Sequence, residues 1–326
     1  MKKGKLLSFP TKPIELSPGM TCSELLEGLE GCSFQGRNLA RAAKIWTRAL
    51  GEDVTVWLGL SGAMVPAGMR RVIVSLMERR YIDVLVSTGA NLYHDLHETV
   101  GNFHYIGSHH ADDRELRDRK IDRIYDTYAD EDQFMALDGE IAAWAVGAIE
   151  ERPYTTREFL HLLGKEAGRR SGGEKGILST AAALDIPVYC PAIGDSSIGI
   201  ALTEAPRPFI FDMIGDVEET AALAAAKKSL VIYVGGGTPK NFIQQTEVTN
   251  LVHGRDVEGH SYAIQFVVDA PHWGGLSGCT FEEAISWGKI SVDAENVTVV
   301  CDATIALPIV AAAVMTRMQG KKRPGR

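Results

Sequence analysis

The sequence predicts an α/β fold, with a Rossmann-like, doubly wound and mostly parallel sheet in a single large domain. Short apolar segments of strand length alternate with segments of helical periodicity, and several predicted strands run directly into small-residue turns. The 326 residues, of which 45% are hydrophobic and 23% charged, are enough to bury one large core. No internal repeat, low-complexity tract or convincing linker divides the chain.

The first part of the pattern is a βαβ unit. Residues 37–50 have helical periodicity, and a strand is expected at 54–60. The turn at 59–62 leads into a helix at about 67–80. Residues 82–87 then form an almost continuous apolar run, which is typical of a strand buried on both faces.

The alternation continues to the end of the domain. A polar loop or a glycine-bearing break precedes several of these elements, and Pro239 suits the first position of a helix. We expect helices at 134–149, 156–168, 176–184 and 217–227, and strands at 188–190, 209–213, 230–234, 263–268 and 297–301.

The two ends of the chain differ from the domain between them. Residues 1–20 are loop-like, because three prolines interrupt them, and we expect a partly ordered N-terminal arm. The domain itself is expected to span 21–318. Residues 319–326 are basic, and we expect this tail to fray.

Composition narrows the class of function. The formal net charge of −8 argues against a nucleic-acid-binding protein and would suit a cationic substrate, although it would serve solubility equally well. Five cysteines without a C-x-x-C pair indicate reduced thiols and a cytoplasmic protein. No apolar run is long enough to span a bilayer, so we expect no membrane partner.

Two small-residue turns directly follow predicted strands and are candidate ligand sites. Gly235, Gly236 and Gly237 would let the backbone approach an anion, beside the N–H groups of the next helix, which suits a dinucleotide pyrophosphate. The spacing differs from G-x-G-x-x-G, so a simple tight turn is an equal alternative. The turn at 88–90 also follows a strand, and two such turns can form a ligand crevice in an open α/β sheet.

Two aspartates follow predicted strands in the same way. Asp195 lies in G-D-S-S and Asp302 lies in C-D-A-T. Each is a candidate for contacts to a ribose or a nicotinamide. Each could instead cap the N-terminus of a helix, which is the usual role of an aspartate at such a position.

Residues 280–290, which read T-F-E-E-A-I-S-W-G-K-I, are a candidate for covalent chemistry. Thr280 and Glu283 have capping-box spacing, and a glycine ends the short helix just before Lys289. The Lys289 amine could contact the indole of Trp287 and a carboxylate such as Glu283, and a lysine so held could attack a carbonyl or imine carbon. The alternative is a solvated lysine at a helix C-terminus, where cations are mildly favoured.

Residues 91–123 hold five histidines among many charged residues. His94 and His97 could meet on one helical face, so metal ligation has to be weighed. No cysteine or regularly spaced carboxylate completes a ligand set, and we therefore expect no metal site. The segment is interpreted as a polar insertion that lines a cleft or a subunit contact.

Several motifs spread along the chain are similar to one family. The chain resembles deoxyhypusine synthase in its C-terminal part, which reads G-L-S-G-C-T-F-E-E-A-I-S-W-G-K-I at 275–290, V-D-A at 292–294 and C-D-A-T at 301–304. The resemblance covers about residues 35–315. Further matching stretches are W-L-G-L-S-G at 57–62, D-V-L-V-S-T-G-A at 83–90, P-A-I-G-D-S-S-I-G at 191–199 and V-G-G-G-T-P-K-N at 234–241.

The resemblance implies an NAD-dependent transferase. In that family the lysine matching Lys289 carries an aminobutyl group as an imine, after a polyamine such as spermidine has been oxidised with bound NAD. Trp287 and Glu283 would complete the catalytic group, and the subunits would form a homotetramer with active sites at a dimer interface. By position, the NAD contacts would fall at Ser61, Thr88, Gly89, Asp195, Gly236, Gly237, Ser277, Asp302 and Ala303.

The residues that would bind the amines depart from the family pattern. The resemblance places His94 and Asp95 at the polyamine end of the site, but family members that modify the translation factor have an acidic residue in place of His94. Asn241 stands where those members have a histidine, and Ile200 and Leu276 stand where they have acidic residues. The residues for covalent chemistry on Lys289 are retained, whereas the sequence does not determine which amines serve as donor and acceptor.

Three classes of function follow. The first is aminobutyl transfer to a protein lysine, or to a small amine such as putrescine or agmatine, as in homospermidine synthases derived from this family. The second is a non-catalytic NAD-binding protein, and the third is an NAD-consuming deacylase. The presence of Lys289 favours the first over the second, and the absence of a C-x-x-C zinc pair weakens the third.

Overall fold

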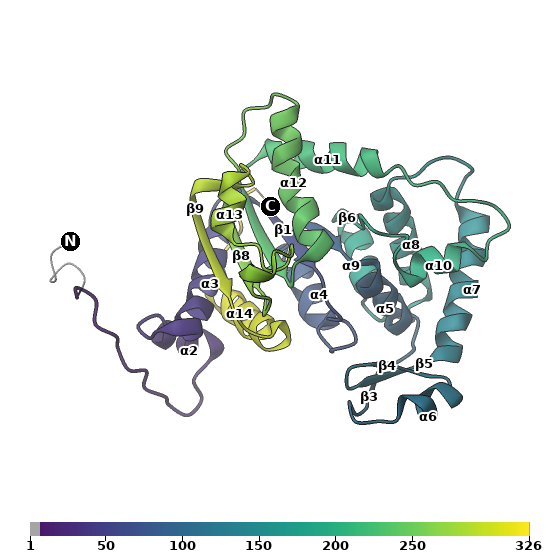
Figure 1. Ribbon diagram of the computed structural model, residues 1–326, viewed down its shortest axis with the longest axis horizontal. Helices are drawn as coiled ribbons and strands as arrows, with labels where there is room; N and C mark the ends of the chain where they lie inside the picture. The colour runs from purple at the N-terminus through teal and green to yellow at the C-terminus, as the bar shows by residue number, and fades with distance from the viewer. Residues whose placement is uncertain (1–6, 326) are drawn as a thin grey trace.

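A sheet of six parallel strands forms the centre of the fold (Figure 1). The computed structural model describes residues 7–325. In sheet order the strands are β6 (Val188–Tyr189), β2 (Val84–Ser87), β1 (Thr55–Leu60), β7 (Ser229–Val234), β8 (His260–Phe266) and β9 (Ile290–Val299). From β1 the chain adds β2 and β6 on one side, then returns to add β7, β8 and β9 on the other. The predicted doubly wound parallel sheet is confirmed.

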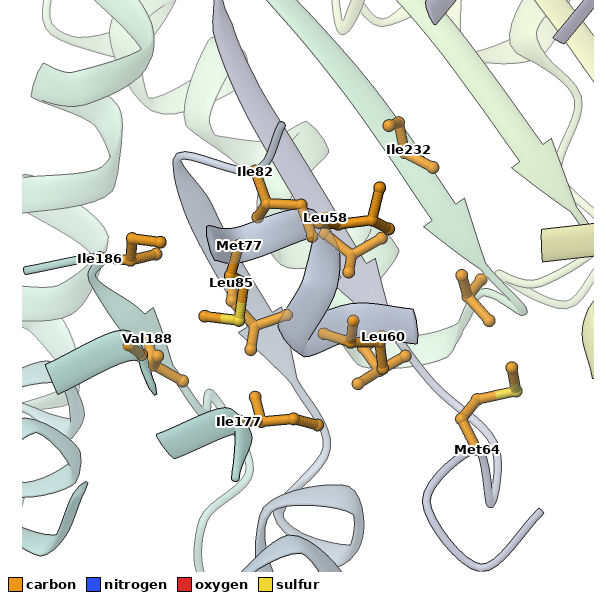
Figure 2. Packing of buried hydrophobic residues seen from close by; sticks show 14 of the residues in the cluster. Leu58, Leu60, Met64, Met77, Ile82, Leu85, Ile177, Ile186, Val188 and Ile232 are labelled. Carbon is orange, nitrogen blue, oxygen red and sulfur yellow. The ribbon is translucent and has the colours of Figure 1, made fainter. Parts of the chain in front are cut away.

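Both faces of the sheet are buried, because alternate residues of each strand enter two separate cores. Within β1, Leu58 and Leu60 belong to the larger core, whereas Trp57 points into the smaller core on the opposite face. Figure 2 shows Leu58 and Leu60 among the side chains of the larger core, together with Leu85 of β2 and Ile232 of β7. Burial on two faces explains why these strands read as continuous apolar runs.

Helices form a layer on each face of the sheet. Over the larger core lie α2 (Cys22–Leu29), α3 (Phe34–Leu50), α4 (Arg70–Glu78) and α14 (Ala303–Arg317). Over the smaller core lie α11 (Met213–Ala226), α12 (Gly237–Val252) and α13 (Phe281–Ser286). Around β6 the larger core continues among α5 (Gly89–Thr99), α7 (Glu131–Ala148), α8 (Thr156–Arg170), α9 (Ile177–Leu184) and α10 (Ser197–Leu202). None of the described helices is long and apolar enough to cross a bilayer.

One predicted strand is wrong. Residues 209–213 do not join the sheet, and Phe211 forms only an isolated bridge with Tyr154. Pro206 and Pro208 precede this segment, and proline removes the N–H donors that a strand ladder requires. The aromatic ring of Phe211 instead packs edge-on against Phe159 of α8, which accounts for the apolar pattern that suggested a strand.

The predicted polar insertion, residues 91–123, leads into a small antiparallel sheet that the residues just after it complete. The strands β3 (Tyr105–Ile106), β5 (Thr127–Asp130) and β4 (Ile121–Ile124) pair in that order, and α6 (Asp113–Asp118) precedes β4. In Figure 1 this sheet lies below α5, away from the parallel strands. The insertion therefore adds a separate surface without changing the central sheet.

The basic C-terminal tail was expected to fray, but among its described residues Arg323 is bound to the domain. Arg323 is only 7% exposed and forms a buried ion pair with Asp83, the residue just before β2. Its Nη2 also donates to the carbonyl oxygen of Val54 at 2.6 Å, and Asp83 accepts from the backbone N–H of Val56 at 2.8 Å. The tail is therefore fixed beside β1 and β2. At the other end, residues 7–20 form an arm without helix or strand, and residues 1–6 of the predicted arm lie outside the described residues.

Arg323→Ala should lower the free energy of unfolding by about 3–5 kcal/mol, because it leaves the Asp83 carboxylate buried without its cation. Urea unfolding followed by circular dichroism measures this change. Lys322→Ala, at the exposed neighbouring position, is the matched control and should change stability by about 0.5 kcal/mol or less. Equal stabilities for the two variants would contradict the structural role of the tail.

Candidate active site

The carboxyl ends of the parallel strands meet at one edge of the sheet, and the loops that follow them carry most of the predicted ligand contacts. In the sheet β1 lies next to β7, but the chain continues from β1 towards β2 and from β7 towards β8. The loops after these two strands therefore diverge, and such a point opens a crevice in a doubly wound sheet. Ser61 follows β1 and Gly235 follows β7.

The loop after β7 depends on glycine. Gly235 and Gly237 have φ values of +70° and +55°. The hydroxyl of Ser61 donates to the carbonyl oxygen of Gly236 at 2.6 Å, and the N–H of Gly237 donates to Oγ of Ser277 at 3.1 Å. A Cβ on Gly236 would lie 2.4 Å from Cα of Ser277. The structure thus gathers four of the predicted NAD contacts around the N-terminus of α12.

A crevice of about 290 Å³ opens beside this helix terminus, and we call it the carboxyl-edge crevice. Three more of the predicted NAD contacts line it, namely Thr88, Gly89 and Asp195. His94, a predicted polyamine contact on α5, lines it as well. The crevice therefore joins the loops after β1, β2, β6 and β7 in one space.

The residues of this edge fit the phosphate-bearing part of a dinucleotide. Gly62, which lines the crevice, and Gly237 both have positive φ, and a Cβ at either position would extend into open space. A ligand backbone can occupy that space because no side chain does. The N-terminus of the 16-residue α12 offers N–H groups and a positive dipole end to an anion.

Two predicted NAD contacts, Asp302 and Ala303, lie elsewhere along the same edge. They follow β9, the last strand of the sheet, at the start of α14. The carboxylate of Asp302 accepts from the N–H of Thr304 at 2.7 Å and from its hydroxyl at 2.6 Å, and these bonds lower the pKa of Asp302. Asp302 is thus a helix cap in this structure, and the crevice does not include it.

The three predicted catalytic residues share a second hollow of about 280 Å³, which we call the lysine pocket. As predicted, Thr280 caps a short helix, α13, by accepting from the N–H of Glu283 at 3.1 Å. Gly288 has φ +69° and ends that segment, and Lys289 follows with only 9% of its surface exposed. Its Nζ lies 5.2 Å from the ring centroid of Trp287, within the range of a cation–π contact. Glu283 lines the same pocket, and so does Asn241 of α12.

The lysine pocket lies between α12 and the segment 274–289, which contains α13. Lys289 immediately precedes β9, and its carbonyl oxygen accepts from the N–H of His260, the first residue of β8. The first turn of α12 separates the two hollows, because Thr238 and Pro239 line the crevice whereas the next two residues line the pocket. The sites are therefore neighbours.

Lys240 is a buried cation that the sequence analysis missed. It is 1% exposed, and its Nζ donates to Oε1 of Gln265 at 2.9 Å and to the carbonyl oxygen of Cys279 at 2.6 Å. Burial lowers the pKa of Lys240 to about 8. A signal was present, because Lys240, Ile243 and Glu247 recur at helical spacing, and charged residues in such a stripe indicate a polar interior.

Asp95, the other predicted polyamine contact on α5, lies inside the protein and does not line the crevice. Its side chain is fully buried, and its two carboxylate oxygens accept from the backbone N–H groups of Ile177 at 2.6 Å and Leu178 at 2.9 Å. Burial raises the pKa of Asp95 to about 6, while these two hydrogen bonds oppose the shift. Asp95 therefore anchors α9 to α5 from the side of α5 that faces away from the crevice.

Three histidines of the insertion lie close together, with Nδ1 of His94 2.9 Å from Nε2 of His104 and the ring centroids of His97 and His104 5.2 Å apart. His94 reaches the crevice, whereas His97 is fully buried against the ring of Phe134, with centroids 4.6 Å apart. Within residues 7–325 no three His, Cys, Asp or Glu side chains are arranged to hold a metal ion.

Comparison with known proteins identifies close relatives. The model of the deoxyhypusine synthase family matches residues 24–314. Probable deoxyhypusine synthase 2 of Methanosarcina acetivorans is 51% identical over 319 residues, which are 96% of this chain and 92% of the relative. The deoxyhypusine synthase-like protein of Elusimicrobium minutum is 36% identical over 323 residues, covering 96% and 86%. A crystal structure named for deoxyhypusine synthase, from Entamoeba histolytica, has a TM-score of 0.62 at 16% identity and covers 96% of this chain and 98% of its own.

Lys240→Met should lower the free energy of unfolding by about 1–3 kcal/mol at pH 7, because buried oxygens lose their donor. The difference from the wild type should grow as the pH rises from about 8 towards 10.5, since the native protein then holds a neutral amine while the unfolded chain still binds a proton. Urea unfolding at several pH values measures it. Lys165→Met, at an exposed position of α8, is the control. A stability difference between the wild type and Lys240→Met that shrinks above pH 8 would contradict the lowered pKa of Lys240.

Proposed function

The chain belongs to the deoxyhypusine synthase family, and we propose that it transfers an aminobutyl group from a spermidine-like polyamine to an amine acceptor through an imine on Lys289. The observation that carries this proposal is the lysine pocket. A mostly buried lysine beside an indole and a carboxylate, with an opening to solvent, can hold an aliphatic amine and attack the imine carbon formed when that amine is oxidised.

NAD is the cofactor that the family implies, and the carboxyl edge of the sheet supplies residues to hold it. Ser61, Gly236, Gly237 and Ser277 would surround the pyrophosphate, and Asp302 with Ala303 would contact the far end of the molecule. From β1 to β9 the edge spans three strand spacings, about 14 Å, which an extended dinucleotide can bridge. Bound NAD would supply a hydride acceptor for the donor amine and would return the hydride after transfer.

Lys289 would perform the covalent step. Its Nζ forms a bond to the imine carbon of the oxidised donor, and the bond from that carbon to the departing diamine nitrogen breaks. The acceptor amine then attacks the same carbon and releases Lys289. Glu283 would hold the free ammonium end of the aminobutyl group, and the face of Trp287 would exclude water from the imine.

The rim of the lysine pocket supports a protein lysine as the acceptor. Trp287 and Leu276 are 61% and 50% exposed, so the pocket opens between apolar side chains at the surface. A lysine side chain could enter from such a rim with its backbone outside. The same exposed residues, together with Trp273 at 75%, support a homotetramer with this face at a subunit contact. The expected location is the cytoplasm.

Titration with NAD should raise the midpoint of thermal unfolding, by the equivalent of about 2.7 kcal/mol at 100 times the dissociation constant. Gly237→Ala should weaken the binding of NAD by about tenfold or more, because the added Cβ would occupy the open space in which we place the ligand. Gly254→Ala is the matched control, since it also has positive φ and open space but lies beyond the other end of α12. NAD binding that is lost equally in both variants would contradict the site.

Lys289→Arg should abolish aminobutyl transfer while NAD binding remains, because arginine keeps a positive charge but cannot form an imine. Mass spectrometry after borohydride reduction with labelled spermidine and NAD should find the label on the peptide that contains Lys289. The translation factor and putrescine, offered separately, distinguish a protein acceptor from a small amine. Transfer by the variant at the wild-type rate, or label on another peptide, would refute the assignment of Lys289 as the nucleophile.

A further inference from the structure

Gln265 is a polar exception in β8, because its neighbours along the strand are buried apolar residues, Ala263, Ile264 and Phe266 among them. Its own side chain is only 1% exposed, and it lies one residue before the carboxyl end of the strand. A buried amide lowers stability unless its polar atoms are hydrogen-bonded. The position of Gln265 therefore depends on the partners that the neighbouring segments supply.

The amide of Gln265 joins two loops. Its Nε2 donates to the carbonyl oxygen of Gly235 at 2.8 Å and to that of Ser277, also at 2.8 Å. Its Oε1 accepts from Nζ of Lys240 at 2.9 Å. Because a carbonyl oxygen only accepts and an ammonium group only donates, these partners allow a single orientation of the amide. Gln265 thus holds the loop after β7 and the backbone of Ser277 at a fixed separation.

Residues 277–279, which we call the Ser277 segment, lie between the cofactor edge and the lysine pocket. On one side, Oγ of Ser277 accepts from the N–H of Gly237 at 3.1 Å, and its Cα packs so closely on Gly236 that a Cβ there would lie 2.4 Å away. On the other side, Cys279 lines the lysine pocket together with Lys289. A shift of the Ser277 segment would therefore change the position of the loop after β7 relative to the lysine pocket.

Lys240 holds the same segment through a second set of contacts. Its Nζ donates to the carbonyl oxygen of Cys279 at 2.6 Å and to that of Ser277 at 3.5 Å. Lys240 also lines the lysine pocket, whereas Gln265 lines neither that pocket nor the carboxyl-edge crevice. Any effect of Gln265 on these two sites must therefore pass through the groups that it holds.

We propose that Gln265 is the positioning residue that fixes the Ser277 segment, and with it the position of the cofactor relative to the donor amine. This inference rests on the proposed function, in which NAD lies along the carboxyl edge and the donor amine lies beside Lys289. Hydride transfer requires contact between the donor carbon and the cofactor, and a displacement of about 1 Å lowers such a rate by about 100-fold. Gln265 therefore controls the rate without touching either reactant.

Gln265→Glu tests the role of the amide with little change in shape. The carboxylate can still accept from Lys240, but it cannot donate, and it repels the carbonyl oxygens of Gly235 and Ser277. The loop after β7 and the Ser277 segment should therefore move apart in this variant.

Asn250→Asp is the matched control. The amide of Asn250 is also fully buried, donates to the carbonyl oxygen of Ala221 at 2.9 Å and accepts from Nη1 of Arg255 at 2.8 Å. It lies near the C-terminal end of α12 and lines neither hollow. Both variants keep the bond to a cation and lose a donor to a backbone carbonyl, so their comparison removes the effect of stability alone.

Calorimetry with NAD shows whether Gln265 acts through Ser277. Gln265→Glu and Ser277→Ala should each weaken the binding of NAD by about tenfold, whereas Asn250→Asp should change it by about twofold at most. The double variant should lose about tenfold rather than about 100-fold, because Gln265→Glu has already displaced the hydroxyl of Ser277. Losses that multiply would overturn the positioning role, since Gln265 would then act independently of Ser277.

The reduction of NAD with spermidine, in the absence of an acceptor, gives the second measurement. Gln265→Glu should lower kcat by about 100-fold at saturating NAD, while Asn250→Asp should retain most of it. Weaker cofactor binding alone would raise the KM for NAD and leave kcat unchanged. A wild-type kcat in Gln265→Glu would therefore overturn the control of the rate by Gln265.

A second variant keeps the test decisive. If circular dichroism shows that Gln265→Glu does not fold, Gln265→Met takes its place, because methionine has a similar length, no charge and no donor. This variant should give the same two results, and wild-type behaviour in both would refute the positioning role.

The outcomes separate the positioning role from the transferase. If the wild type binds NAD and the losses do not multiply, but spermidine does not reduce NAD, the proposed function fails while the fixing of Ser277 by Gln265 is supported. If the wild type does not bind NAD, both fail together. If Gln265→Glu behaves like Asn250→Asp in both measurements, the positioning role alone is refuted.

Discussion

The fold depends on one constraint, which is that both faces of the parallel sheet are buried. Side chains of β1 alternate between two apolar cores, so Leu58 and Trp57 leave no room for ligands on either side of the central strands. Polar chemistry is confined to places where strands have ended or where helices stand apart. The carboxyl-edge crevice occupies the first kind of place, and the lysine pocket between α12 and α13 occupies the second.

The sequence was sufficient for elements whose pattern is local. Continuous apolar runs bounded by glycine predicted β1, β2 and β7, because a strand buried on two faces needs an apolar residue at each position. The sequence was insufficient where contacts with a distant segment determine the structure. The pattern around Phe211 is typical of a strand, but this segment forms only an isolated bridge and does not join the sheet. Arg323 lies in a basic segment typical of a mobile tail, but it pairs with a buried carboxylate 240 residues away in the sequence.

The residues of the candidate site also fall into those that local sequence predicts and those that depend on distant segments. Glycines can be read from sequence because their spacing alone permits the turns, and Lys289 could be placed by the glycine and short helix that precede it. Asp95 could not be interpreted, since the same carboxylate can face a ligand or cap a helix, and the position of α9 determines which. Lys240 was missed because the carbonyl oxygen that accepts from it belongs to a loop 39 residues further on.

The ion pair of Arg323 links two segments that lie 240 residues apart in the sequence. β1 and β2 gain this contact only when the segment around residue 323 has docked beside them, so the local stability of these strands depends on a distant part of the chain.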